Sequence, residues 1–84
     1  MRPAVKVSVL VRPKEGILDP QGAAVEDSLR KLGFDVSGAR VGRVVDVEVD
    51  APSEDEARAR VDEMCRQLLA NPLIESYAIE VQPQ

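Results

Sequence analysis

The chain has 84 residues and a formal net charge of −4, from 11 Lys and Arg against 15 Asp and Glu. It has no His and one Cys, which excludes the usual zinc ligand sets, His-dependent nucleophiles and an internal disulfide. An acidic chain with one Phe, one Tyr and no Trp is also poorly suited to bind nucleic acid. We expect one domain over residues 1–84. Because no apolar run resembles a leader or a membrane span, we also expect a cytoplasmic protein.

The first half of the chain predicts a strand followed by a helix. Residues 4–12 alternate Val with other residues, which is typical of a half-buried strand. Asp19 followed by Pro20 is typical of a helix start, and the helix is expected over 20–32 with Gly33 as its C-terminal cap. One apolar stripe runs along this helix, formed by Val25, Leu29 and Leu32.

The middle of the chain predicts a hairpin of two strands. The first is expected over 34–41 and bent near Gly38, because Phe34 and the valines behind it are spaced for a strand. A turn is placed at Gly42 and Arg43. The next strand is expected over 44–49, where Val alternates with Asp and Glu.

The last third predicts a second helix and a last strand. Ser53 with Glu56 three residues later forms a capping box, so the helix is expected over 54–70. Asn71 and Pro72 end it, and a strand follows over 74–81.

This order of elements predicts an α+β fold of the ferredoxin-like type, βαββαβ. We expect a four-stranded antiparallel sheet, with the strands over 4–12 and 44–49 at its centre and both helices on one face. The other face is mixed in character, so a second copy or a partner is expected to cover it. Its residues are Lys6, Ser8, Leu10, Asp46, Glu48, Ala78 and Glu80.

No catalytic arrangement is visible in the sequence. The acidic run at 54–56 is interpreted as a capped helix start, and Cys65 as a small core residue. The segment 13–22 has two equal interpretations: a loop that folds its apolar residues back onto the helix, or a contact loop. Gly22, in the first helical turn, is expected to allow another chain or a ligand to approach closely. The segment 40–43 is interpreted first as a solvated tip and second as a contact.

Five stretches together resemble one family, PurS. They are Lys14-Glu15-Gly16-Ile17-Leu18-Asp19-Pro20-Gln21-Gly22, Leu32-Gly33, Arg40-Val41-Gly42, Met64-Cys65 and Leu68-Leu69-Ala70-Asn71-Pro72-Leu73-Ile74-Glu75. The likeness covers nearly the whole chain. Arg43 departs from the Lys that the family commonly carries after the Arg-x-Gly, and a guanidinium differs from an ammonium in its contacts.

The resemblance implies the small subunit of phosphoribosylformylglycinamidine synthase, a ligase of purine biosynthesis. That complex converts formylglycinamide ribonucleotide, glutamine and ATP into formylglycinamidine ribonucleotide. A PurQ-like glutaminase releases ammonia, and a PurL-like synthetase uses ATP and Mg²⁺ to incorporate it. This chain is then expected to be a dimeric or tetrameric adaptor without a catalytic residue, metal or cofactor of its own. It would bridge the two larger subunits and help transfer ammonia, with no nucleic acid or membrane as partner.

The contact residues expected from the two interpreted segments and the resemblance are Lys14, Gly16, Ile17, Leu18, Asp19, Gln21, Gly22, Arg40, Gly42 and Arg43. The alternative function is a regulatory dimer of the ACT type that binds an amino acid. In that case the helix start after Asp19 would hold the ligand's carboxylate. An RNA-binding module of the same topology is disfavoured, because the two strands expected at the centre of the sheet carry no aromatic residue.

Overall fold

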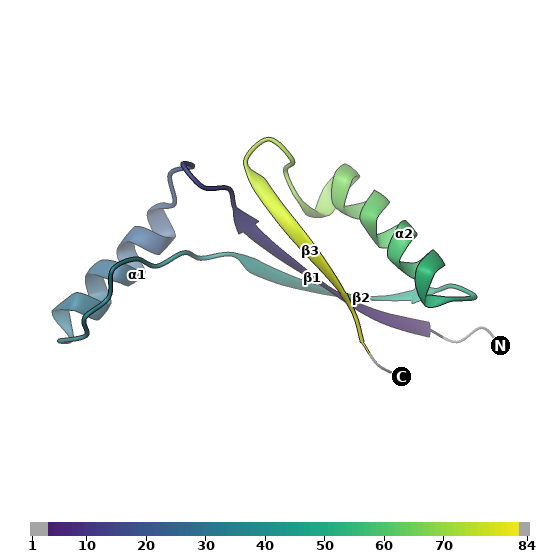
Figure 1. Ribbon diagram of the computed structural model, residues 1–84, viewed down its shortest axis with the longest axis horizontal. Helices are drawn as coiled ribbons and strands as arrows, with labels where there is room; N and C mark the ends of the chain where they lie inside the picture. Colours follow the sequence, from purple (N-terminus) through teal and green to yellow (C-terminus); the bar gives the residue numbers. More distant parts are fainter. Residues whose placement is uncertain (1–3, 83–84) are drawn as a thin grey trace.

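A computed structural model of the chain describes residues 4–82. The element order is β1 (Ala4–Pro13), α1 (Pro20–Lys31), β2 (Arg43–Asp50), α2 (Glu54–Met64), the π-helical turn η1 (Cys65–Leu69) and β3 (Glu75–Val81). Figure 1 shows α2 lying along the sheet, whereas α1 lies beyond one end of it. None of the helices in residues 4–82 is long and apolar enough to cross a bilayer.

The sheet has three antiparallel strands in the order β2-β1-β3. In its register Val9 lies opposite Val45 on one side and Ile79 on the other, and Val7 lies between Val47 and Val81, so these rows across the sheet are apolar on one face. This face packs against α2, which explains why the odd-numbered valines of β1 are buried. The core consists of Val5, Val7, Val9, Val11, Val49, Ala51, Ala57, Val61, Cys65 and Ala70.

Helix α2 begins as the capping box predicts. The Ser53 hydroxyl accepts a hydrogen bond from the Glu56 backbone N–H at 3.1 Å, and acidic residues fill the first turn. The predicted helix over 54–70 is confirmed as α2 followed by η1, where the Ala70 N–H donates to the Cys65 carbonyl at 3.1 Å. This wider last turn leads directly into the 70–75 turn before β3.

Two expectations about the sheet are wrong. Residues 34–42 form no strand, so the sheet has three strands instead of four, and β2 lies at its edge instead of its centre. Both differences arise at Gly42, where the sequence predicts a turn but the chain does not turn. A Cβ there would overlap the Val11 carbonyl oxygen, so Gly42 instead lets the backbone pass close to β1 and continue straight into β2.

The expectation that both helices cover one face is also wrong. Of the helices in residues 4–82, only α2 packs on the sheet, and α1 extends away from it (Figure 1). The molecule is therefore long and thin, with extents of 53 × 27 × 14 Å. Its radius of gyration is 16.3 Å, whereas a compact chain of this length has about 12 Å. The apolar stripe of α1 therefore stays largely exposed among the described residues, with Val25 at 42% and Leu32 at 74%.

The buried row of β1 should carry much of the stability. Val9→Ala removes two carbons from a completely buried side chain and should lower the free energy of unfolding by about 2 kcal/mol. The matched control Val44→Ala, 61% exposed on the other face, should change it by less than about 0.5 kcal/mol. Urea unfolding followed by circular dichroism measures both, and equal losses would contradict this packing.

Candidate functional site

Two chain segments, 13–19 and 39–43, connect the sheet to α1, and we call them the neck. The turn 70–75 lies against the neck, because the Lys14 N–H donates to the Ile74 carbonyl at 2.9 Å. All ten residues expected as subunit contacts lie in the neck or in the first turn of α1. The structure therefore brings these residues to one end of the sheet.

Asp19 joins the two segments of the neck. Its Oδ1 accepts from the Gly22 N–H at 2.9 Å and so caps α1, while its Oδ2 accepts from the Val41 N–H at 2.9 Å. The hydrogen bond from Val41, then that from Gly22, lowers the pKa of this carboxyl below its ordinary value. One ionised side chain thus fixes both the start of α1 and the return of the chain to β2.

Gly22 is buried because the carbonyl of Ala39 approaches it closely. A Cβ at this position would lie 2.5 Å from the Ala39 oxygen and would also overlap the Asp19 carboxylate. The close approach predicted for Gly22 is therefore made within the same chain. It also bears on the alternative function, because at this helix start the Gly22 N–H already donates to the Asp19 carboxylate and the Ala23 N–H to the Asp19 carbonyl.

Arg43 braces the neck against the turn before β3. Its guanidinium donates to both oxygens of Glu75, at 2.6 and 3.1 Å, and also to the Leu69 carbonyl. The bond from Arg43 is the main reason that the pKa of Glu75 lies below its ordinary value, and it raises that of Arg43. The side chain of Arg43 is therefore bound to the rest of the chain, unlike the solvated tip first expected for the segment 40–43. A lysine ammonium would not reproduce this forked contact.

The 70–75 turn is held by contacts that sequence reasoning did not assign. The Asn71 N–H donates to Glu75 Oε1 at 2.7 Å, Asn71 Oδ1 accepts from the Leu73 N–H at 3.1 Å, and Lys14 Nζ donates to the Pro72 carbonyl at 2.7 Å. The sequence predicts only that Asn71 and Pro72 end the helix, and the family resemblance adds the stretch from Asn71 to Glu75 without assigning these contacts.

The braced neck and turn nevertheless present apolar side chains to solvent. The side chains of Leu18 and Leu73 are 86% and 83% exposed, and that of Ile17 is 38% exposed. A shallow hollow beside them is lined by Pro13, Leu18, Asp19, Pro20, Gln21, Val41, Gly42, Arg43 and Glu75. Arg40 lines a neighbouring hollow together with Gly42 and Arg43, and Gly16 sits in an open turn at φ +83°. This end of the molecule is suited to contact another protein surface.

Two titratable groups outside the neck, Tyr77 and Cys65, have pKa values that their packing shifts. The Tyr77 hydroxyl donates to Asp62 Oδ1 at 2.6 Å, and this bond raises the pKa of Tyr77. Burial raises the pKa of the Cys65 thiol, which disfavours the reactive thiolate. Within residues 4–82, no group of three or more His, Cys, Asp or Glu is arranged to hold a metal ion.

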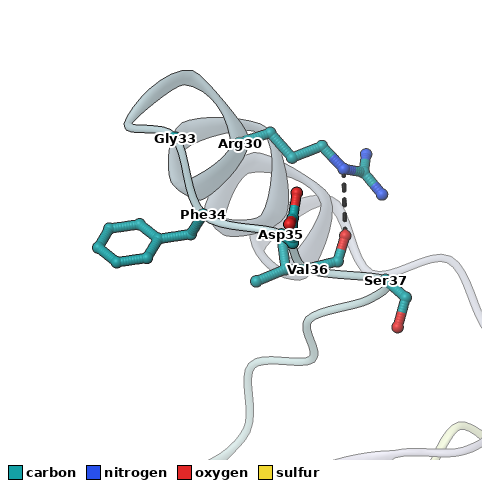
Figure 2. Close-up of a pocket in the computed structure, with 6 residues that line it drawn as sticks. All are labelled: Arg30, Gly33, Phe34, Asp35, Val36 and Ser37. Carbon is teal, nitrogen blue, oxygen red and sulfur yellow. Dashed lines mark hydrogen bonds between the residues drawn. The ribbon is translucent and has the colours of Figure 1, made fainter.

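A third hollow lies at the far end of α1 and outside the neck, lined by Arg30 and residues 33–37. Figure 2 shows Arg30 donating from Nε to the Val36 carbonyl, at 3.2 Å, while the Phe34 ring points away from the helix. Gly33, at φ +97°, makes the reversal that ends α1, as its predicted role as C-terminal cap requires. Phe34 is 58% exposed, so this end of α1 also displays apolar surface.

The sequence profile of PurS, described as phosphoribosylformylglycinamidine (FGAM) synthase, matches residues 6–83 of this chain. The chain belongs to the PurS family. The PurS subunit of Synechocystis is 43% identical over 77 residues, which cover 90% of this chain and 75% of that protein. The PurS subunit of Bacillus subtilis is 40% identical over 78 residues, covering 92% of each chain.

Solved PurS structures share the fold described above. The purS subunit from Thermotoga maritima is 30% identical and superposes with a TM-score of 0.91, covering 98% of this chain and 95% of that one. A chain in the PurLQS structure from the same organism is 31% identical and gives a TM-score of 0.88, covering 95% and 99%. The agreement over nearly the whole length includes α1 and the neck.

The close approach at Gly22 predicts that Gly→Ala at this position of the PurS chain changes stability in the opposite direction to Gly→Ala in an open helix. Gly→Ala in an open helix stabilises by about 1 kcal/mol. Gly22→Ala should instead destabilise by about 1–3 kcal/mol, because the new Cβ must displace Asp19 or Ala39. Gly38→Ala is the matched control, since its Cβ would have only Glu26 Oε1 nearby, at 3.7 Å. Thermal unfolding compares them, and a stabilised Gly22→Ala would overturn the assignment.

The lowered pKa values of Asp19 and Glu75 predict how stability depends on pH. A carboxyl whose pKa is lower in the folded chain stabilises the fold fully above its unfolded pKa, which is about 4. This contribution is lost as pH falls through the lower, folded value. The free energy of unfolding should therefore decrease on acidification below about pH 5.

Asp19→Asn and Glu75→Gln should each be less stable than the unaltered chain at pH 7, and the difference should shrink toward pH 2. Urea titrations at several pH values measure this difference. A gap that stays constant from pH 7 to pH 2 would show that the charge of these groups does not matter.

Proposed function

We propose that this chain is the non-catalytic small subunit of phosphoribosylformylglycinamidine synthase and bridges a glutaminase and a synthetase subunit. The observation that carries the proposal is the neck, where apolar side chains are exposed on a braced backbone. The chain in the Thermotoga maritima PurLQS structure that superposes on this one supports the same assignment. In a cytoplasmic complex of this kind the chain also assembles with itself.

The reaction explains why a subunit without catalytic residues is needed. The glutaminase releases ammonia from glutamine, and the synthetase uses ATP and Mg²⁺ to activate the amide oxygen of formylglycinamide ribonucleotide so that ammonia can replace it. Ammonia that escapes into water is protonated and no longer a nucleophile. A bridge that holds the two larger subunits together therefore raises the yield of the transfer. In this proposal the chain itself holds no ATP, metal or other cofactor.

The neck is the contact surface in this proposal. Leu18 and Leu73 are exposed on segments fixed by Asp19, Arg43 and Asn71, so docking does not need to order these segments. Burying one such leucine contributes about 1.5–3 kcal/mol. Arg40 adds a charge beside the same surface that fits a carboxylate on the partner.

The test compares two activities of the assembled complex. Leu18→Ser and Arg40→Ser should each lower glutamine-dependent turnover by about 10-fold, as expected for losing one interface anchor. Turnover with ammonium chloride in place of glutamine should stay within about twofold, because it needs no transfer between subunits. The control Arg66→Ser lies outside the neck and pairs with Asp62 and Glu63 on α2, so it should affect neither activity.

Equal loss of both activities would mean that the substitutions damage the synthetase step itself. No loss of either would mean that the neck is not a contact surface. Either result would contradict the proposal.

A further inference from the structure

Helix α2 covers one face of the sheet (Figure 1), and the opposite face, which we call the open face, presents the even-numbered side chains of β1. One row across the open face is apolar. In this row Leu10 of β1 lies between Val44 of β2 and Ala78 of β3. Leu10 is half-buried, whereas Val44 is 61% exposed and Ala78 is exposed. The next row, with Ser8 at its centre, is polar, so the first three side chains form an apolar strip.

Two arginine side chains lie beside the apolar strip. Arg12 of β1 and Arg40 of the neck line one hollow together with Leu10 and Val44. Both arginines are exposed, and within residues 4–82 neither forms an ion pair or donates a hydrogen bond from its side chain. The other arginines of this part of the chain each bond to a carboxylate or a carbonyl; they are Arg30, Arg43, Arg58, Arg60 and Arg66. Arg12 and Arg40 therefore keep their donors for another molecule.

The charges of the open face are separated along its length. No acidic residue lines the hollow beside the neck, although the whole chain has a net charge of −4. The Asp19 carboxylate lies near Arg40, but its oxygens already accept from backbone N–H groups. The acidic side chains of the open face lie toward the other end of the strands; they are Asp46, Glu48 and Glu80. Since a guanidinium binds a carboxylate through two parallel hydrogen bonds, the end beside the neck fits a surface that carries carboxylates.

The size of the open face indicates that its occupant is a larger protein. Strand spacing and rise give this face dimensions of about 15 × 25 Å. Two copies stacked through it alone would bury only about 800 Å² in total, which is less than the ~1,200 Å² of a stable specific interface. A larger protein bound at the neck reaches the apolar strip without a break, because Gly42 and Arg43 line both this hollow and the one beside Leu18.

We propose that the apolar strip and the hollow between Arg12 and Arg40 extend the contact surface of the neck and bind an acidic segment of the larger subunit that docks there. Carboxylates of that segment accept from the two arginines, and an apolar side chain between them covers Leu10 and Val44. The acidic far end of the open face repels the same segment in the reverse direction, so the charges fix how the chain lies on its partner.

This assignment rests on the proposed function, because the occupant is a subunit of the same complex. It adds Arg12, which the sequence does not identify as a contact residue, and it gives the unpaired charge of Arg40 a defined neighbour.

The test measures binding of the full-length chain and its variants to the purified synthetase and glutaminase subunits, separately and together, by biolayer interferometry. Arg12→Glu reverses the charge of the hollow and should raise the Kd of the subunit that binds there by at least about 30-fold. Arg12→Lys keeps the charge and should raise it by less than about fivefold. The loss caused by Arg12→Glu should shrink as NaCl is raised from about 50 to about 500 mM.

The matched control is Arg58→Glu, which makes the same charge change on α2, away from the open face. It should leave the Kd within about twofold. Val44→Ser tests the apolar strip and should raise the Kd about fivefold while leaving the urea midpoint of unfolding unchanged. Equal losses for Arg12→Glu and Arg58→Glu, or equal losses for Arg12→Glu and Arg12→Lys, would overturn the proposal.

Two further results would assign the surface to another occupant and so overturn the proposal. In the first, Arg12→Glu dissociates copies of the free chain in sedimentation but binds the larger subunits normally. In the second, calorimetry shows that inorganic phosphate binds the unaltered chain and not Arg12→Glu, again with normal binding of the larger subunits. An unaltered chain that binds neither larger subunit would overturn the proposed function as well, whereas equally tight binding of Arg12→Glu would overturn this proposal alone.

Discussion

The carboxylate of Asp19 is the constraint on which the rest of the molecule depends. One of its oxygens binds the Gly22 N–H at the start of α1, and the other binds the Val41 N–H in the segment of the neck that returns to β2. Gly22 and Gly42 provide the space for this junction, because neither position accommodates a Cβ. Once the junction is closed, α1 points away from the sheet. The exposed stripe, the elongated shape and the unfilled edge of β2 all follow from that direction.

Local sequence patterns determine those elements that depend only on neighbouring residues. The alternation in residues 4–12, the cap at Asp19 and the capping box at Ser53 each depend on neighbouring residues, and the elements that they predict are present. A strand over 34–41 also has a suitable local pattern, but a strand needs a neighbouring edge, and within residues 4–82 this segment pairs with none. Gly42 looks like a turn residue in the sequence, whereas its role is to pass close to β1.

The same limit applies to the candidate site. The sequence identifies the neck as unusual through its glycines, prolines and exposed apolar residues, and five of its ten proposed contact residues line one hollow. It does not reveal that Arg43 binds Glu75, because the two are 32 positions apart and no spacing rule connects them. Nor does it show that the N–H groups of Gly22 and Ala23 already donate to Asp19, which disfavours a ligand carboxylate at this helix start.

A chain of this size has a small core, here formed mainly by one row of valines on β1 and one side of α2. Much of its remaining apolar surface is displayed on rigid segments instead of being buried. This division suits a subunit of a larger assembly, since surfaces that are already ordered bind with little loss of conformational entropy. The braces at Asp19, Arg43 and Asn71 therefore serve the fold and the assembly together.

The most direct test of the adaptor function is to leave this chain out. Purified synthetase and glutaminase subunits are mixed with and without it, and formylglycinamidine ribonucleotide is measured with glutamine or ammonium chloride as the nitrogen source. The account predicts that glutamine supports product formation only when this chain is present, whereas ammonium chloride supports it equally in both mixtures. A full glutamine-dependent rate without the chain would contradict the account.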